Sequence, residues 1–186
     1  MRIVSIVALV SMAVLPLFGQ PREGKGKELS LSGSYQNYSS GNSSGGGSFL
    51  ASTRVGFFLG EGFELEPEMV MMLTSGSEPV YMLNGNVSYN FVSARKGAPF
   101  LLIGYGLANT VPFFNVPSIR LDFRIGVLNI GGGVKVFLKE GIAVRIEYRY
   151  QSFSGEGETT HYGPYSFTQK VDTRIHTVQF GFSVLL

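Results

Sequence analysis

Residues 142–150 alternate apolar and charged side chains with a period of two. The apolar positions are Ile142, Val144, Ile146, Tyr148 and Tyr150, and the charged positions are Arg145, Glu147 and Arg149. Successive side chains of a β-strand point to opposite faces, so this segment has one apolar face and one charged face. Strands of membrane-spanning barrels show this pattern over about ten residues. The segment therefore predicts a strand with lipid on one side and a polar lumen on the other.

Similar alternation predicts eight strands, near 28–38, 49–59, 63–73, 81–91, 99–108, 128–138, 142–150 and 176–186. Polar and glycine-rich segments between them, including 39–48 and 152–171, are predicted as loops. The connections alternate between short ones and longer ones, as in outer-membrane barrels with short periplasmic turns and longer outside loops. We predict an all-β fold, an eight-stranded antiparallel up-and-down transmembrane β-barrel, with both termini on the periplasmic side.

Residues 1–20 are predicted to be a cleaved secretory signal peptide. Met1 and Arg2 precede an apolar run that ends at Phe18, and small Gly19 follows. This is the usual order of regions in a signal peptide. The run is shorter than the roughly 20 residues that a membrane-spanning helix needs, so a retained anchor is the less favoured alternative. The mature chain would be one barrel domain at 21–186, exported to the bacterial outer membrane.

The composition excludes several classes of protein. The chain has no cysteine, so it has neither a lipidation site nor a disulfide framework. The formal charge is +2 without a long basic cluster, which argues against nucleic-acid binding. A soluble barrel also alternates, with its apolar face inward. Its polar outer face would usually carry more charge than this chain provides, at 15% charged residues and a mean hydropathy of +0.18.

Two segments resemble the sixth and seventh strands of small outer-membrane β-barrel proteins. They are 128–138, LNIGGGVKVFL, and 143–150, AVRIEYRY. Segment 99–107 is similar to the fifth strand of these eight-stranded OmpA/OmpX-like proteins, and 65–68 to their third. The resemblance implies a barrel fold and an outer-membrane location. It does not imply one activity, because members are adhesins, tethers between membrane and wall, narrow channels or proteins of unassigned role.

The chain departs from this family in its last residue and its aromatic residues. Family members usually end in an aromatic residue that the barrel-assembly machinery recognises, whereas this chain ends in Leu186, so we expect Phe180, Phe182 and Leu186 to form the assembly signal. Tryptophan is absent, so tyrosines must occupy the membrane interfaces. The candidates are Tyr35, Tyr81, Tyr89, Tyr105, Tyr148 and Tyr150. Pro67 lacks an N–H in mid-strand and predicts a bulge or local bend.

Charged residues on the predicted inner faces form the main candidate site. They are Arg54, Glu64, Glu66, Glu68, Lys135, Arg145, Glu147 and Arg149. Strands three and seven lie opposite each other in an eight-stranded circle, and such a lumen is only wide enough for side chains to fill it. Buried charges must be paired, so we predict a salt-bridge network across the lumen. We interpret it as a structural plug; the alternative is a gate that exchanges ion pairs.

Enzymatic chemistry is not predicted. The two histidines, His161 and His176, have no nucleophile and orienting group at a spacing that suits catalysis. They also have no clustered carboxylates or cysteines, so we predict neither a metal site nor a cofactor. The glycine run at 131–133 precedes no helix, so it is not a phosphate loop.

The predicted function is a structural or surface-interaction role, adhesin-like, for a monomeric barrel with a plugged polar interior. The partners would be outer-membrane lipid, the barrel-assembly machinery and an extracellular partner that contacts the loops at 109–124 and 155–170, where binding residues concentrate. One alternative is a narrow channel or porin for small solutes. A second is a soluble secreted β-barrel that binds a lipophilic ligand.

Overall fold

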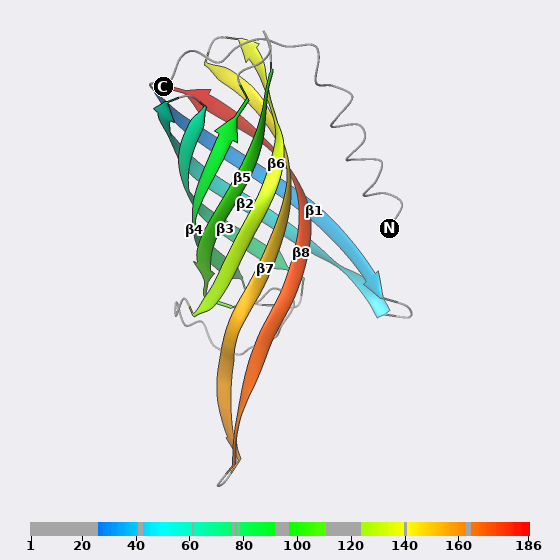
Figure 1. Ribbon diagram of the computed structural model, residues 1–186. Helices are drawn as coiled ribbons and strands as arrows, with labels where there is room; N and C mark the ends of the chain where they lie inside the picture. Colours follow the sequence, from blue (N-terminus) through cyan, green and yellow to red (C-terminus); the bar gives the residue numbers. More distant parts are fainter. Residues whose placement is uncertain are drawn as a thin grey trace.

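Eight antiparallel strands form a closed barrel in the computed structural model of the chain (Figure 1). The structure describes residues 26–40, 43–60, 62–75, 77, 79–91, 97–110, 124–139, 141–162 and 165–186. The strands are β1 (Lys27–Ser40), β2 (Ser43–Gly60), β3 (Phe63–Thr74), β4 (Val80–Asn90), β5 (Gly97–Ala108), β6 (Ile125–Lys139), β7 (Ile142–Tyr162) and β8 (Tyr165–Leu185). Each strand pairs with its neighbours in sequence, and β8 pairs with β1. The predicted fold class is confirmed. In the described part of the chain, no helix has the length and apolar character needed to span a membrane.

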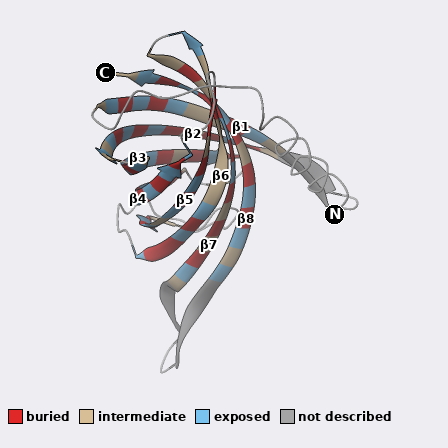
Figure 2. Cartoon of the chain, turned by 45° about the horizontal axis from the view of Figure 1, so that its top comes forward, coloured by how far each residue is buried: buried red, intermediate tan, exposed pale blue. Residues whose placement is uncertain are grey.

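Side chains alternate between buried and exposed along the barrel strands (Figure 2). On β4, Asn84 and Asn86 are buried, whereas Leu83 and Val87 are 52% and 41% exposed. Large apolar residues are exposed on all eight strands. A band of this kind suits lipid rather than water. The predicted faces are therefore confirmed, and the alternative of a soluble barrel with its apolar faces inward is wrong.

The barrel has two unlike rims. The short-turn rim carries the connections after β2, β4 and β6. The long-loop rim carries the other four: the connection after β5 is the longest of all, and those after β1 and β7 end hairpins that run past the neighbouring ladders. Gly60, Gly62 and Gly141 have φ angles of 104°, 89° and 79° at the short-turn rim, a backbone conformation that glycine adopts without strain. The first and last strands meet there, because the Leu186 N–H donates to the Lys27 carbonyl at 2.8 Å.

Two predicted loops are shorter in the structure. The 39–48 loop is largely strand, since β1 continues to Ser40 and β2 begins at Ser43. The prediction of a loop at 152–171 is wrong over 152–162 and 165–171, because β7 and β8 remain paired out to Tyr162 and Tyr165. The β6–β7 ladder stops at Gly126 and Ser154, so this hairpin continues beyond the barrel wall. A two-stranded ribbon outside the wall needs no lipid-facing side, which explains why its sequence does not alternate.

The seam between β1 and β8 is short. Pairing runs only from Glu28 and Leu185 to Gly33 and Phe180, although β1 pairs with β2 along nearly its whole length. Beyond Gly33, β1 and β2 lean away from β8 (Figure 1). The Gln36 amide nitrogen donates to the His176 carbonyl at 2.9 Å in this region. A side chain thus bonds to β8 where the backbone ladder has ended.

Pro67 does not produce the expected bulge. Arg54 pairs with Glu68 and Phe57 pairs with Leu65, so the β2–β3 register is the same on both sides of the proline. The ladder only omits the two pairs between them. On the other side of β3, Pro67 pairs with Gly85 without interruption. The missing proline N–H therefore interrupts the ladder locally and leaves the register unchanged.

Candidate functional site

Nine charged side chains of the described residues gather in the lumen, in the half nearer the short-turn rim. They are Glu28, Arg54, Glu64, Glu66, Glu68, Lys135, Arg145, Glu147 and Arg149, each at most 4% exposed. We call this set the lumen charge network. The structure brings together all eight residues singled out from the sequence. Glu28 was missed, although it shares the inward parity of Ser30 and Ser34, and that parity could have identified it.

Arg54 joins three other strands from its position on β2. Its Nε donates to Glu68 Oε1 on β3 at 2.6 Å, and its Nη1 donates to Glu147 Oε2 on β7 at 2.7 Å. Its Nη2 donates to Gln179 Oε1 on β8 at 2.9 Å. Planar guanidinium groups suit several such directed bonds at once. One side chain therefore ties together a large part of the barrel wall.

Ion pairs also join β3 to β7 across the lumen. Arg149 on β7 pairs with Glu68 on β3 at 2.5 Å, and Arg145 on β7 pairs with Glu66 on β3 at 2.9 Å. Glu147 lies between these two arginines and accepts from the Nε of each, at 2.9 and 2.6 Å. Opposite walls of the barrel are thus connected by short ion pairs between β3 and β7.

Lys135 lies at the edge of the lumen charge network nearer the short-turn rim, and the aromatic ring of Phe100 lies beside it. Lys135 Nζ donates to Glu28 Oε2 and to Glu64 Oε2, each at 2.7 Å. The Arg145 guanidinium lies over the Phe100 ring, 4.2 Å from its centroid. Cation–π contacts of this kind gain strength when the groups are desolvated. Aromatic rings and paired charges therefore pack together at this level.

The described network contains one more carboxylate than cations. Its five glutamates face three arginines and Lys135. Glu64 shares Lys135 with Glu28, and Glu64 Oε1 has no hydrogen-bond partner. Glu68, by contrast, is held by both Arg54 and Arg149. The excess negative charge is therefore least compensated around Glu64.

Amide side chains adjoin the charged layer. Asn84 and Asn86 on β4 donate to Glu68 Oε2 at 3.0 and 3.1 Å. Their amide oxygens occupy the space that a side chain at Gly106 or Gly104 on β5 would need. Nearer the long-loop rim, the Gln151 amide nitrogen donates to Asn129 Oδ1 at 2.9 Å. Glycines on one strand thus make room for amides on the next.

The half of the lumen nearer the long-loop rim is apolar, which corrects the prediction of a polar interior throughout. Its buried residues are Leu50, Val70, Met72, Val80, Met82, Ala108, Ile125, Val127, Phe153 and Ile175. The expected polar interior is therefore correct only for the other half. At 70–73 all four residues are apolar, so alternation gives no signal for the inward face. We call this set the apolar lumen layer.

The predicted interfacial tyrosines belong to the outer surface of the wall. Tyr89 lies at the short-turn rim in edge contact with Phe63 and Phe91, with ring centroids 4.9 Å apart in each pair. The other five tyrosines lie on the wall farther from the short-turn rim. Tyr35 and Tyr105 are 70% and 59% exposed, Tyr148 is 36% exposed, and Tyr81 and Tyr150 are half-buried.

The candidate residues of the predicted assembly signal lie on the outer face at the end of the chain. Phe180 and Phe182 are exposed on the outer face, 59% and 62%, and Leu186 is 76% exposed. The predicted signal peptide at 1–20, most of the predicted 109–124 loop and the side chain of His161 lie outside the described residues. The 155–170 segment is β-hairpin in its backbone.

Comparison with known proteins shows similarity in fold without close similarity in sequence. No family model matches the chain, and no curated protein matches it. The N-terminal β-barrel domain of OprF from Pseudomonas aeruginosa is 14% identical with a TM-score of 0.59, covering 89% of this chain and all of that domain. Neisserial surface protein A is 13% identical with a TM-score of 0.60, covering 88% of this chain and 99% of that one.

A designed transmembrane β-barrel is similar as well. It is 10% identical with a TM-score of 0.52, and the match covers 90% of this chain and 99% of the design. A designed sequence shares the architecture without sharing a biological role. Fold alone does not fix function. The comparisons thus establish a small membrane-barrel fold, and the function has to be argued from the lumen and the surface.

Proposed function

We propose that this protein is a closed, non-conducting outer-membrane barrel with a structural and surface-interaction role. The observation that carries the proposal is the lumen charge network, in which buried ion pairs join β3 to β7 across the lumen. An eight-stranded barrel has an interior that side chains can fill. The apolar lumen layer adds a second barrier, because a hydrated ion loses its water when it enters an apolar constriction.

The two rims support an orientation in the membrane. Short turns face the periplasm in bacterial outer-membrane barrels, and longer connections face outside. The short-turn rim and both ends of the barrel would then be periplasmic. The β7–β8 hairpin, which continues past the last β6 pair at Ser154, would project outside the cell. An adhesin-like contact through this hairpin is the surface-interaction role that we propose.

The route to the membrane completes the proposal. A leader at 1–20 would direct export of the 21–186 barrel, and the barrel-assembly machinery would recognise the last strand through Phe180, Phe182 and Leu186. Both phenylalanines face outward, where a second protein can contact them before the wall closes. The barrel would function as a monomer, and no enzymatic activity is proposed.

Conductance across a planar lipid bilayer tests the closed lumen. We expect no stepwise current from the wild-type barrel. Single neutralisations Glu66→Gln, Arg145→Met, Glu147→Gln and Arg149→Met should lower stability without opening a path, because the apolar lumen layer remains. Lys139→Ala, at the exposed end of β6, is the control. Discrete wild-type openings whose size changes in the lumen variants, and not in the control, would instead establish a narrow channel.

A further inference from the structure

A backbone ladder joins β1 to β8 along only part of the seam between them. The ladder ends at Gly33 and Phe180. Beyond it β1 pairs with β2 and β8 pairs with β7, so each strand continues without the other. The Gln36 amide nitrogen, which donates to the His176 carbonyl at 2.9 Å, ties the two strands together there. We call this part of the seam, 34–37 of β1 and 176–179 of β8, the open seam.

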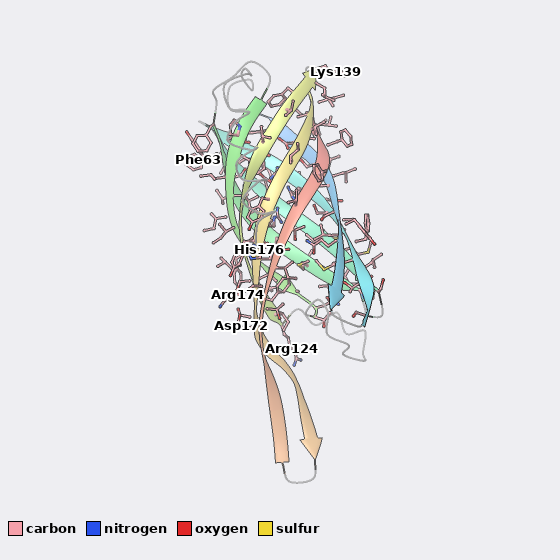
Figure 3. The ribbon with its side chains drawn as sticks, turned by 90° about the vertical axis from the view of Figure 1, so that its right-hand side faces the viewer. Phe63, Arg124, Lys139, Asp172, Arg174 and His176 are labelled. Atoms are coloured by element: carbon pink, nitrogen blue, oxygen red, sulfur yellow. The ribbon has the colours of Figure 1, made fainter. Side chains whose placement is uncertain are left out.

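The open seam lies at the level of the membrane's hydrocarbon. Gly33 is six residues from Lys27, which meets Leu186 at the short-turn rim. At a rise of about 3.3 Å per residue and a tilt of about 40°, six residues rise roughly 15 Å along the barrel axis, within an apolar band about 25 Å tall. In Figure 3, His176 accordingly lies well along the wall from Lys139, which is at the short-turn rim. Acyl chains of the surrounding lipid therefore adjoin the open seam.

The apolar lumen layer reaches the open seam from both sides. Leu50 on β2 is buried and pairs in register with Ser34, the first residue of β1 beyond the ladder. Ile175 on β8 is buried too and comes directly before His176. Phe153 on β7 continues the layer away from the seam. Hydrocarbon outside the wall and apolar side chains inside it are therefore separated here by two strands without a shared ladder.

Three buried polar side chains lie where this layer meets the lumen charge network. Asn129 Nδ2, Gln151 Oε1 and Thr177 Oγ1 have no hydrogen-bond partner among the described residues, and each residue is at most 2% exposed. Gln151 pairs in register with Asn129 on β6 and is the diagonal neighbour of Thr177 on β8. Side chains in these two relations lie about 5 Å and 7–8 Å apart at their Cβ atoms.

These three groups form a floor that one small head group can contact. The Gln151 amide nitrogen donates to Asn129 Oδ1 at 2.9 Å and lies 3.9 Å from Met82 Sδ, in the apolar lumen layer. The free atoms are the amide donor of Asn129, the hydroxyl of Thr177 and the amide oxygen of Gln151. A buried polar group without a partner is unfavourable. The floor therefore favours a ligand that both accepts and donates hydrogen bonds.

The head group that fits this floor is uncharged. Arg149, which pairs with Thr177 in the β7–β8 register, is already held by Glu68 and Glu147. The network also carries one carboxylate in excess of its cations. An ionised carboxylate would add to that excess, whereas a protonated carboxylic acid accepts through its carbonyl and donates through its hydroxyl. Apolar surroundings favour the protonated form of such an acid.

We propose that the barrel binds a fatty acid that enters from the membrane through the open seam. Its chain lies among the residues of the apolar lumen layer, and its protonated carboxyl contacts Asn129, Gln151 and Thr177. A single chain is favoured over a two-chain lipid because an eight-stranded barrel has room inside for side chains or one small ligand. The inference rests on the membrane location in the proposed function. It leaves the lumen charge network closed.

Photolabelling with a fatty acid that carries a diazirine in its chain tests the site. The reagent is added to barrel already inserted in phosphatidylcholine vesicles, and peptide mass mapping locates the adducts. We expect adducts inside the lumen, as at Leu50 and Phe153, besides those on the outer wall at Phe180. An excess of dodecanoic acid should remove the lumen adducts and leave the outer ones, because a single site saturates and the bulk lipid does not. Wild-type adducts confined to the outer wall would overturn the site.

Thr177→Val tests the head group with little change in shape. The valine lacks the hydroxyl, so lumen adducts should fall about fivefold relative to outer-wall adducts, the usual effect of one hydrogen bond. Thr53→Val makes the same replacement on the exposed outer face and should match wild type. The methyl ester of the labelled acid, which cannot donate to Gln151, should also label the lumen more weakly. Unchanged lumen labelling in Thr177→Val would overturn the assigned floor.

Joining the two strands tests the route of entry. Tyr35→Cys/Val178→Cys places thiols across the open seam, where a short bismaleimide can join them before the fatty acid is added. Leu83→Cys/Leu107→Cys, joined in the same way across the intact β4–β5 ladder, is the control. Lumen adducts should be lost in the joined seam and kept in the control; equal lumen labelling would overturn entry through the seam. Failure of the wild type to insert, seen as no heat-dependent gel shift, would overturn the proposed function as well, whereas an inserted barrel without lumen adducts overturns this site alone.

Discussion

At the scale of residues, the lumen charge network combines strongly and weakly compensated carboxylates. Glu68 accepts from two arginines, Arg54 and Arg149, and from two asparagines. Glu64 shares the single cation Lys135 with Glu28, accepts from Asn90 and leaves Oε1 unpaired. Removing one partner of a buried ion pair leaves the other charge uncompensated, and this costs more than the pair itself contributes. The two glutamates should therefore respond differently to the same substitution.

Glu68→Gln should destabilise the barrel by about 3–5 kcal/mol, because Arg54 and Arg149 lose a shared carboxylate. Glu64→Gln should cost less than about 1 kcal/mol, because it removes the excess negative charge and leaves Lys135 paired with Glu28. Urea titrations of the vesicle-inserted barrel, followed by circular dichroism, measure both. Equal losses in the two variants would contradict this assignment of the excess charge.

Sequence reasoning identified most of these residues because inward parity is unambiguous on β3 and β7. At 64–68, glutamates alternate with Leu65 and Pro67, so only one register places charge inside. Which charged residues pair with each other could not be predicted from the sequence. The choice of partner depends on how far neighbouring strands are shifted along one another, which the alternation of side chains does not show. Glu28, at the edge of the first predicted strand, was missed for lack of a nearby charged neighbour on that face.

At the scale of elements, the β1–β8 seam is the shortest ladder of the wall. Closure depends on six residue pairs. Gly181 lies within them, and a Cβ there would overlap the backbone of Leu31 and Ser32 on β1. Backbone atoms cannot move aside as the end of a flexible side chain can. The close approach of β1 to β8 therefore favours glycine at this position.

Gly181→Ala should destabilise the barrel by about 1–3 kcal/mol, the usual cost of overpacking. Gly85→Ala is the matched control, since a Cβ there meets only the Tyr105 carbonyl at 3.9 Å. The control should be neutral or slightly stabilising, because alanine has less conformational freedom to lose. The unfolding midpoint in urea distinguishes the two variants. A tolerated Gly181→Ala would mean that β1 is not fixed against β8 as described.

The β7–β8 hairpin beyond the wall should be dispensable for folding. Gly155 pairs with Val171, so an Asn-Gly turn can join these residues and replace 156–170. The β6–β7 ladder, which ends at Ser154, is untouched by this deletion. We expect a stability within about 1 kcal/mol of wild type and a normal heat-dependent gel shift. A deletion variant that does not fold would show that the hairpin is part of the barrel's folding unit.

The sequence predicted five of the eight strands to within three residues at each end, and missed the first part of β2 and the outer parts of β7 and β8. Alternation arises where one face meets lipid and the other meets the lumen, as at 142–150. Beyond Ser154, β7 is no longer part of the barrel wall, so its two faces do not meet lipid and lumen and its sequence need not alternate. Gly/Ser/Thr-rich sequence then resembles a loop, even though cross-strand pairing continues to Tyr162 and Tyr165.

At the scale of the whole molecule, the lumen has a charged half near the short-turn rim and an apolar half near the long-loop rim. The apolar half was not predictable from alternation, because Val70, Met72 and their outward neighbours are all apolar. The composition favoured a barrel whose outer face contacts lipid. The exposed apolar residues on all eight strands agree with this prediction. The central claim is that the apolar outer face contacts lipid while the lumen excludes water.

Site-directed spin labelling on β4 tests that claim most directly. The chain has no cysteine, so single-cysteine variants at Leu83, Asn84, Asn86 and Val87 can be labelled without background. In lipid vesicles, labels at 83 and 87 should relax strongly with oxygen, which concentrates in lipid, and labels at 84 and 86 should be accessible neither to oxygen nor to a water-soluble nickel complex. Nickel access at 84 and 86 would show a water-filled lumen, and nickel access at 83 and 87 would show that the apolar face does not contact lipid.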